Sequence, residues 1–503
     1  MVRVLQQAIK TFKFAKNFRK YKRATSESEK IKAAKLISTF IKHEGGIFLK
    51  VAQYMGTSKE HSLELQKLSH LDDIGIKKEK AYKILKKESP SFVKHIKVFP
   101  EQIATASIGQ VHKVSYKGED WAVKIQYPHI RKELTRQLRL MNLIPTKKIE
   151  KKWGLDINLY REMVKRLIDD ELDYKKEANK QREIATLMGE SPYYIIPKVL
   201  DEHSGDKVII TEYLEGLNAD ELSELSIKYK KSLSTSLAFT YLSLFKNGYT
   251  QGDSNHGNFI FVWNGEQVRT GLIDFGQFYN FEETFVTAFF SFLCNLIDGR
   301  GVNYIDYYCA LGFKLENLLH IKEHLGILTE VIFKPFLVNK SLNLECWKYK
   351  EEIDQILGEN KWWFRTAGGE EFFLVIKSFL GFKNLVQKNN GVINWQQIFK
   401  EVVVERKECY LSYTPPKQLH SKLENRRELL VEIKEGKSTI ALIREPISSI
   451  LDIKNILSDD LQKKIKKENI DIVEIVKKSL SDGVTSGDIF FLETDRSYRI
   501  SII

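Results

Sequence analysis

The chain has 503 residues, of which 43% are hydrophobic and 29% charged, and its formal net charge is +13. Four cysteines lack metal-site or disulfide-framework spacing, and no secretory signal is evident, which argues against a secreted disulfide-rich protein and indicates a reducing cytosol. The most apolar run, 285–297, is too short to span a bilayer and predicts a buried helix. The length predicts about three structural units, and the positive charge fits either a lysine-rich composition or attraction to an anionic surface.

Residues 1–25 predict a basic amphipathic helix. Apolar residues recur at helical spacing from Val2 to Phe12, and the rest of the segment is rich in Lys and Arg. This pattern fits a helix packed on the protein's own body, which we favour, or an interfacial membrane helix. SESEK at 26–30 predicts a cap that starts the next helix, and 60–95 alternates helix-like runs with polar breaks.

The sequence becomes β-rich from about residue 98. GQVHKVSY at 109–116 and DWAVKIQY at 120–127 flank a KGED turn, so they predict a hairpin. A charged helical section follows at 129–190. KVIITEYLEG at 207–216 then predicts another strand that ends in a break.

From residue 217 the chain is predicted to be mostly helical. The exception is a second hairpin in NFIFVWNGEQVRTGLIDF, with its turn at WNGEQ. Two prolines in SYTPPKQ at 412–418 predict a linker. The last hundred residues predict helices with Lys/Glu faces and a terminal hairpin in DIFFLETDRSYRISII.

Several short motifs occur in the order expected of phosphoryl-transfer enzymes. WAVK places Lys124 on a strand, QGDSNHGNFIF contains Asp253 and Asn258 as D-x-x-x-x-N, and Asp274 begins DFG. The small-residue segment ATASIG, 104–109, predicts a turn before that strand, and TEYLEG predicts a strand, hinge and helix. Kinase-type sites use such a loop over the phosphates, a strand lysine, and Asp and Asn groups around Mg²⁺. Each motif alone is weak, but the ordered set predicts a kinase-like fold.

The chain resembles the UbiB/AarF atypical kinases, a family associated with ubiquinone biosynthesis. IATASIGQVHKV at 103–114 resembles the family's alanine-rich loop, and GGIFLKVAQ at 45–53 resembles its K-x-G-Q motif. ELDYKKEANK at 171–180 resembles its E-x-D motif and the helix glutamate beyond it. The resemblance covers roughly residues 40–300 and includes a long insertion after Lys124.

The resemblance implies a role for each matching residue. Lys124 would contact the α- and β-phosphates and pair with Glu177, Asp253 would be the catalytic acid, and Asn258 and Asp274 would hold Mg²⁺. The residues expected against the nucleotide are Ala104, Thr105, Ala106, Ser107, Glu212 and Tyr213. The regulatory residues implied are Lys50 and Gln53 of the extension, which would meet Glu171 and Asp173.

The sequence departs from the family pattern at several positions. Ala52 replaces the glycine of K-x-G-Q, Thr105 replaces the middle alanine of the loop, and Gly252 stands where a typical kinase has the arginine of H-R-D. We interpret His256, in the same loop, as a structural hydrogen-bonding residue rather than a base. None of these substitutions removes an expected metal ligand or the expected phosphate-binding lysine, so we still expect the chain to bind a nucleotide.

The sequence therefore predicts an α+β, protein-kinase-like two-lobed fold. The expected parts are a helical N-terminal extension over 1–95, an N-lobe with inserted helices over 96–215, a helix-rich C-lobe over 216–411 and an accessory region over 418–503.

The expected function is an atypical kinase or ATPase that uses ATP/ADP and Mg²⁺ and serves quinone or isoprenoid-lipid metabolism. One alternative is a small-molecule phosphotransferase of the aminoglycoside or choline kinase type, and another is a pseudokinase-like regulator that binds nucleotide or lipid. The expected location is cytoplasmic, with peripheral contact to an anionic membrane or an isoprenoid lipid. Nucleic acid is not expected as a partner, because the charge is spread along helices and no aromatic-basic motif is evident.

Overall fold

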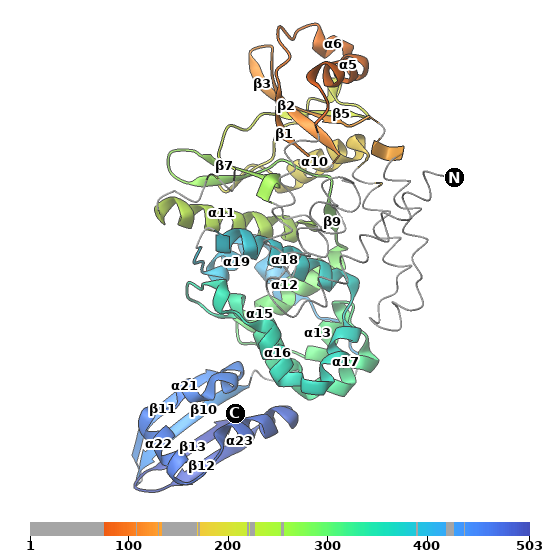
Figure 1. The fold of residues 1–503 in the computed structure, drawn as a ribbon. Coiled ribbons are helices and arrows are strands. Elements are labelled where there is room, and N and C mark those ends of the chain that lie inside the picture. The colour runs from red at the N-terminus through yellow and green to blue at the C-terminus, as the bar shows by residue number, and fades with distance from the viewer. Residues whose placement is uncertain are drawn as a thin grey trace, which may run out of the picture. The chain divides into compact units, whose positions relative to one another are not determined.

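The computed structural model describes residues 75–106, 108–128, 130–132, 169, 172–218, 221, 227–252, 256–388, 391–418, 427–436 and 438–503. The helix predicted over 1–25 and five of the predicted site residues, Lys50, Gln53, Ser107, Glu171 and Asp253, lie outside these ranges. The described chain forms two compact units (Figure 1). The first contains the residues up to Gly189 together with Ile195–Gly216 and Gly271–Gln277, and the second contains Glu190–Tyr194, Leu217–Thr270 and Phe278–Ile503.

The first unit is built on a four-stranded antiparallel sheet with strand order β1-β2-β3-β5. The predicted β2-β3 hairpin is confirmed, and Lys117 and Gly118 in its turn both have positive φ, as a tight hairpin turn requires. The strand predicted within 207–216 is also confirmed. The elements are α5 (Lys78–Glu88), α6 (Pro90–Val93), β1 (Gln102–Thr105), β2 (Gly109–Tyr116), β3 (Glu119–Gln126), α10 (Tyr174–Met188) and β5 (Val208–Glu212).

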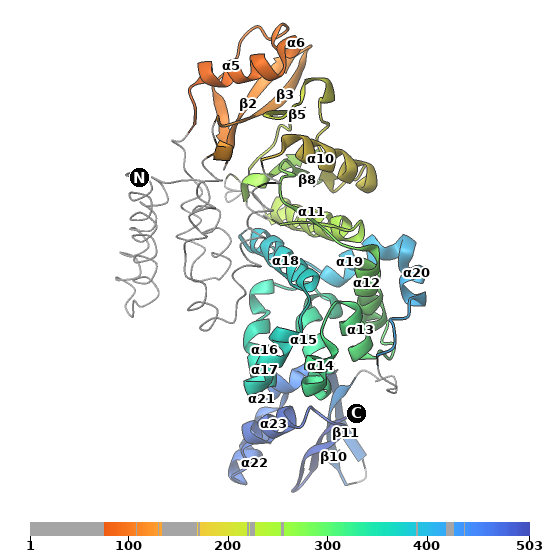
Figure 2. The ribbon, with the colours of Figure 1, turned by 90° about the vertical axis from the view of Figure 1, so that its right-hand side faces the viewer.

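Opposite faces of this sheet carry different chemistry. Successive side chains of a strand point to opposite faces. Val123 and Ile125 of β3 are fully buried in a core with Leu85 of α5 and with residues of α6. Lys124 between them therefore points to the other face, where α10 lies (Figure 2).

A chain of hydrogen bonds joins β2 to the segments before it. Gln110 Oε1 accepts from the Ile76 N–H at 2.7 Å, and its Nε2 donates to Ile76 O at 3.1 Å. The same Nε2 lies 2.9 Å from His112 Nε2, and His112 Nδ1 lies 3.1 Å from Pro100 O. Every donor then meets an acceptor only if His112 is neutral, with its proton on Nδ1. The QVH segment of the sequence thus has a structural role.

The stability of the first unit is expected to fall below about pH 6.5 because of His112. Burial lowers the pKa of His112 below its ordinary value of 6.5. Between these two pKa values the unfolded chain binds more protons than the folded chain, so the free energy of unfolding decreases as the pH falls. Urea unfolding of wild type and of His112→Gln between pH 5 and 8 measures this effect. The difference between the two proteins should shrink below about pH 6.5; a constant difference would show that His112 does not titrate on unfolding.

The second unit is mostly helical, as predicted. Helix α12 contains the apolar run predicted to be a buried helix, and every residue from Phe285 to Leu296 except Thr287 is buried. The predicted second hairpin is confirmed as β7-β8, which belongs to a sheet with order β4-β8-β7, while β6 pairs with β9. The strands are β4 (Tyr194–Ile195), β6 (Tyr249–Gln251), β7 (Phe259–Trp263), β8 (Val268–Leu272) and β9 (Phe278–Asn280). The helices are α11 (Ile227–Lys246), α12 (Glu283–Ile297), α13 (Tyr304–Ala310), α14 (Leu315–Leu318), α15 (Leu325–Leu337), α16 (Tyr349–Leu357), α17 (Lys361–Ala367), α18 (Glu370–Lys388), α19 (Trp395–Val403) and α20 (Lys407–Ser412).

The C-terminal part contains a four-stranded antiparallel sheet with order β11-β10-β13-β12. The predicted terminal hairpin, β12-β13, is confirmed. The expectation of helices was wrong for 428–446, because LLVEIKEGKSTIALIREP alternates apolar and polar residues around Gly436, which has a φ of +60° and suits a hairpin turn. The elements are β10 (Glu428–Glu435), β11 (Ser438–Pro446), α21 (Ile453–Ile456), α22 (Asp459–Lys467), α23 (Ile472–Ser481), β12 (Gly487–Glu493) and β13 (Ser497–Ile502).

Two further features bear on the predicted environment of the chain. All four cysteines are free thiols. Within the described ranges, we find no helix with the length and apolar character needed to cross a membrane.

Candidate active site

Three of the predicted site residues meet in the first unit. Lys124 Nζ donates to Glu177 Oε1 at 2.7 Å and lies 3.6 Å from Asp274 Oδ1. The Glu177 side chain is 4% exposed, that of Lys124 14% and that of Asp274 33%. One ammonium group is therefore held between a buried carboxylate and a second carboxylate that solvent reaches.

The charges of this cluster keep Lys124 protonated. Burial by itself lowers the pKa of Lys124, but the carboxylates of Asp274 and Glu177 outweigh it and raise the pKa above its ordinary value. The backbone of the DFG segment is tied to the same groups. The Gly276 N–H donates to Asp274 Oδ1 at 2.9 Å, and the Phe275 N–H lies 3.5 Å from Glu177 Oε1.

The turn between β1 and β2 is shorter than the sequence predicts. Ala104 and Thr105 are not in the turn but at the end of β1, where they pair with Val111 and Gln110 of β2. The physical reason is that the backbone ladder continues up to Thr105 and outweighs the turn tendency of the small residues. The Ala106 N–H then donates to the Gly109 O at 2.8 Å, and Gly109 already begins β2.

Gly109 is expected to tolerate no side chain. A Cβ atom at this position would lie 2.5 Å from Ile125 O and 2.7 Å from Tyr174 Oη. Gly109→Ala should therefore lower the free energy of unfolding by about 1–3 kcal/mol, as overpacking does. The matched control is Gly205→Ala in the same unit, where the nearest atom, Glu88 Oε2, is 3.5 Å from the added Cβ. Urea unfolding should separate the two variants, and equal midpoints would contradict the crowding at Gly109.

The predicted hinge residues, Glu212 and Tyr213, lie at the end of β5. Glu212 ends the strand and is exposed, and the Tyr213 N–H donates to Asp120 O at 3.1 Å. Lys113 Nζ lies 4.2 Å from the centroid of the Tyr213 ring and forms an ion pair with Asp120. The Tyr213 N–H therefore already donates to a protein carbonyl. It could donate to the adenine base of a nucleotide only if its hydrogen bond to Asp120 O were broken.

Asp173 directly precedes α10, the helix that carries Glu177. Its Oδ1 accepts from the Lys176 N–H at 3.1 Å, which makes it the N-cap of α10. The preceding carbonyl, Leu172 O, accepts from Gln126 Nε2 at 3.1 Å and so ties the helix start to β3. Asp173 therefore helps to fix Glu177, while the regulatory role that the resemblance implies for it stays a prediction.

Asn258 belongs to the second unit, where it ends a 3₁₀ turn (His256–Asn258) directly before β7. The side chain of His256 is not described. Gly252, which precedes Asp253, is crowded, since a Cβ there would lie 2.8 Å from the Tyr279 ring. An arginine at this position would displace Tyr279, which explains this departure from H-R-D.

The sequence reasoning missed the residues that support Gly252. Lys377 Nζ of α18 donates to Tyr279 Oη at 3.2 Å, and Ser378 Oγ donates to Gln251 O at 2.9 Å. The sequence did contain a signal for this contact, since Lys377 lies inside the apolar run FFLVIKSFLGF. A lysine in such a run is seldom buried without a polar partner, so a partner could have been expected.

The described residues fit a metal only together with a bound phosphate. Across the part of the chain with described placement, no three His, Cys, Asp or Glu side chains cluster as metal ligands do. Mg²⁺ is often held by one or two carboxylates with waters and substrate phosphates as its other ligands. The half-buried carboxylate of Asp274 beside a permanent cation suits that kind of binding.

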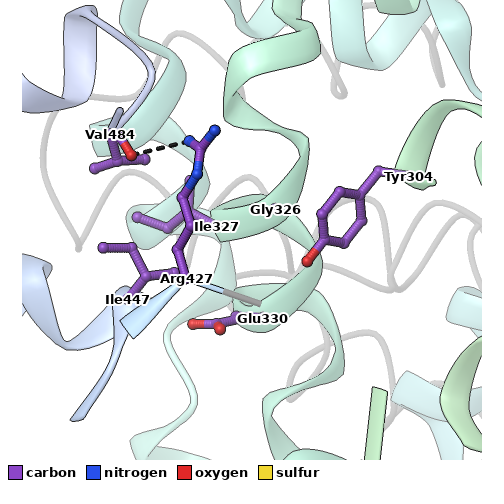
Figure 3. Close-up of a pocket in the computed structure, with 7 residues that line it drawn as sticks. All are labelled: Tyr304, Gly326, Ile327, Glu330, Arg427, Ile447 and Val484. Carbon is purple, nitrogen blue, oxygen red and sulfur yellow. Dashed lines mark hydrogen bonds between the residues drawn. The ribbon is translucent and has the colours of Figure 1, made fainter. Parts of the chain in front are cut away.

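A pocket in the second unit is too small for a nucleotide, with room for about one water molecule. Glu330 Oε2 of α15 accepts there from the Ser448 N–H at 2.9 Å, and Arg427 Nη1 donates to Val484 O at 2.9 Å (Figure 3). The Glu330–Ser448 hydrogen bond joins the C-terminal part to α15, whereas the Arg427–Val484 bond lies within the C-terminal part. The lining residues are Tyr304, Gly326, Ile327, Glu330, Arg427, Ile447 and Val484.

Comparison with known proteins points to one family. Residues 72–303 match the ABC1 atypical kinase-like domain. The chain is 26% identical over 309 residues to the mitochondrial atypical kinase COQ8 of Saccharomyces cerevisiae, which covers 60% of each protein. It is 30% identical over 184 residues to COQ8B of Danio rerio (36% of this chain, 29% of that protein) and 25% identical over 276 residues to AarF domain-containing kinase 1 of Drosophila melanogaster (53% of each). The chain thus spans 60% or less of the length of these relatives.

A solved structure shares the fold. It is the complex of Rv3197 with erythromycin from Mycobacterium tuberculosis, with a TM-score of 0.50 and 19% sequence identity, and the likeness covers 75% of this chain and 97% of that one. At this identity the likeness concerns the fold alone. Together with the domain match, it confirms the predicted α+β, protein-kinase-like fold class.

Proposed function

The chain belongs to the UbiB/AarF family of atypical kinases, and from this premise we propose that it binds ATP with Mg²⁺ and transfers or hydrolyses the terminal phosphoryl group. The observation that carries the proposal is the Lys124 ammonium held between Glu177 and Asp274. A fixed cation beside a solvent-reached carboxylate is the arrangement that positions a polyphosphate in kinase-type sites.

Each of these residues has a distinct task in the proposed reaction. Lys124 binds phosphate oxygens, and Glu177 holds Lys124 in place through the 2.7 Å hydrogen bond. Asp274 offers a carboxylate oxygen to Mg²⁺, which supplies charge neutralisation at the phosphates when bound. The catalytic acid Asp253 and the second metal ligand Asn258 remain assignments that rest on the resemblance.

The proposed setting is quinone or isoprenoid-lipid metabolism at an anionic membrane surface, from the cytoplasmic side. Support comes from the family and from the net charge of +13, which attracts a protein to anionic surfaces.

Phosphate release from ATP by the purified full chain tests the proposal. It is measured with Mg²⁺ or with excess chelator, and with anionic, neutral or no liposomes. We expect turnover that requires Mg²⁺ and rises with anionic liposomes. Tight ATP binding without turnover under all conditions would favour the pseudokinase-like regulator, and rapid phosphorylation of a hydroxylated metabolite would favour the small-molecule phosphotransferase. A chain that binds no ATP would contradict the proposal.

A further inference from the structure

Tyr174, the first residue of α10, lies against the Lys124 ammonium. Its side chain is fully buried, and the centroid of its ring is 5.3 Å from Lys124 Nζ. The attraction between a cation and an aromatic ring at this distance helps to fix the lysine. The ring therefore belongs to the lining of the candidate site.

The hydroxyl group of Tyr174 has no such explanation. Within the described part of the chain its Oη is buried and forms no hydrogen bond. A buried hydroxyl without a partner destabilises a fold, and phenylalanine would fill the same space without that penalty. The hydroxyl is favourable only in a state that supplies an acceptor.

The position of this hydroxyl places it near the proposed phosphate site. Tyr174 Oη lies 2.7 Å from the Cβ position of Gly109, the first residue of β2 after the short turn. Val111 pairs with Lys124, so Gly109, two residues earlier on β2, faces the same side of the sheet as the lysine. Burial raises the pKa of Tyr174, so the group keeps its proton and can donate.

We propose that the Tyr174 hydroxyl donates a hydrogen bond to a phosphate oxygen of the nucleotide bound at Lys124. This inference rests on the proposed function. The adjacent ammonium attracts an anion, and a phosphate chain supplies an acceptor that the described residues of the protein do not. Tyr174 is then a second donor to the polyphosphate, provided by the same helix that holds Glu177.

The test compares Tyr174→Phe with wild type by calorimetric titration with Mg-ATP and with adenosine, and by thermal unfolding without nucleotide. We expect the affinity for Mg-ATP to fall about 10- to 100-fold, as for a lost hydrogen bond to a charged group. Adenosine affinity should stay unchanged, because it has no phosphate. The melting temperature of the free protein should be equal or higher, because an unpaired buried hydroxyl is removed.

Tyr116→Phe is the matched control in the same unit. Tyr116 Oη lies 2.9 Å from His203 Nε2, so this variant loses an existing hydrogen bond. It should melt at a lower temperature, with Mg-ATP affinity unchanged. Tyr174→Phe should therefore lose Mg-ATP affinity without losing thermal stability, whereas Tyr116→Phe should lose thermal stability without losing Mg-ATP affinity.

Equal affinity of Tyr174→Phe and wild type for Mg-ATP would overturn the inference and leave the proposed function standing. If Tyr174→Phe and Tyr174→Met both fail to fold, the hydroxyl and ring serve the fold, and the inference is also overturned. A wild-type chain that binds no Mg-ATP would instead overturn the proposed function, and the inference with it.

Discussion

Lys124→Met is expected to lower the free energy of unfolding by about 3–5 kcal/mol. The substitution keeps most of the side-chain volume but removes the charge that faces Glu177, whose side chain is only 4% exposed. A buried carboxylate without its partner is strongly unfavourable, because neither water nor a cation then compensates its charge. Urea unfolding at neutral pH measures the loss.

The double variant Lys124→Met/Glu177→Leu shows whether the loss arises from the pair. Removing both charges should recover most of the stability, since apolar replacements of a buried ion pair are often close to neutral. The control is Lys175→Met, which breaks the exposed Lys175–Asp206 ion pair and should leave the unfolding midpoint unchanged. If the loss of unfolding free energy in the double variant equals the sum of the losses in the two single variants within about 0.5 kcal/mol, Lys124 and Glu177 are not coupled.

Asp274→Asn is expected to reduce ATP turnover by at least about 100-fold, as loss of a charged group at the transition state does. The amide has the same shape, and its oxygen can still accept from the Gly276 N–H, which now donates to Asp274 at 2.9 Å. The carboxylate charge offered to Mg²⁺ is lost. Steady-state phosphate release at saturating Mg-ATP measures the change, and circular dichroism verifies the fold.

Asp206→Asn is the control for the turnover measurement. Asp206 is an exposed aspartate of the same unit, paired with Lys175, and its substitution should leave turnover unchanged. Full activity in Asp274→Asn would show that Asp274 is not a metal ligand in the reaction.

Local patterns predicted a large part of the fold. The β2-β3 hairpin follows from two alternating runs around a turn, and the place of Lys124 on β3 follows from that hairpin. The buried helix α12 follows from its apolar run. The β10-β11 hairpin had the same kind of signal, an alternating pattern around Gly436, but the abundance of Lys and Glu obscured it.

The contacts that shape the site could not be predicted in the same way. Ala104 and Thr105 pair with β2 instead of forming the turn that their small side chains favour. This pairing depends on the sheet as a whole. The approach of Tyr174 to Gly109, and of Tyr279 to Gly252, joins residues far apart in the sequence. No local spacing encodes such contacts, because they arise when separate elements pack.

The most direct test of the nucleotide site is a crystal structure of the full chain with Mn²⁺ and a non-hydrolysable ATP analogue, since anomalous scattering locates the metal. We expect a metal at about 2.1 Å from a carboxylate oxygen of Asp274. Lys124 Nζ should lie within hydrogen-bonding distance of a phosphate oxygen while it keeps its contact with Glu177. A metal and phosphate chain bound away from both Lys124 and Asp274 would contradict the site.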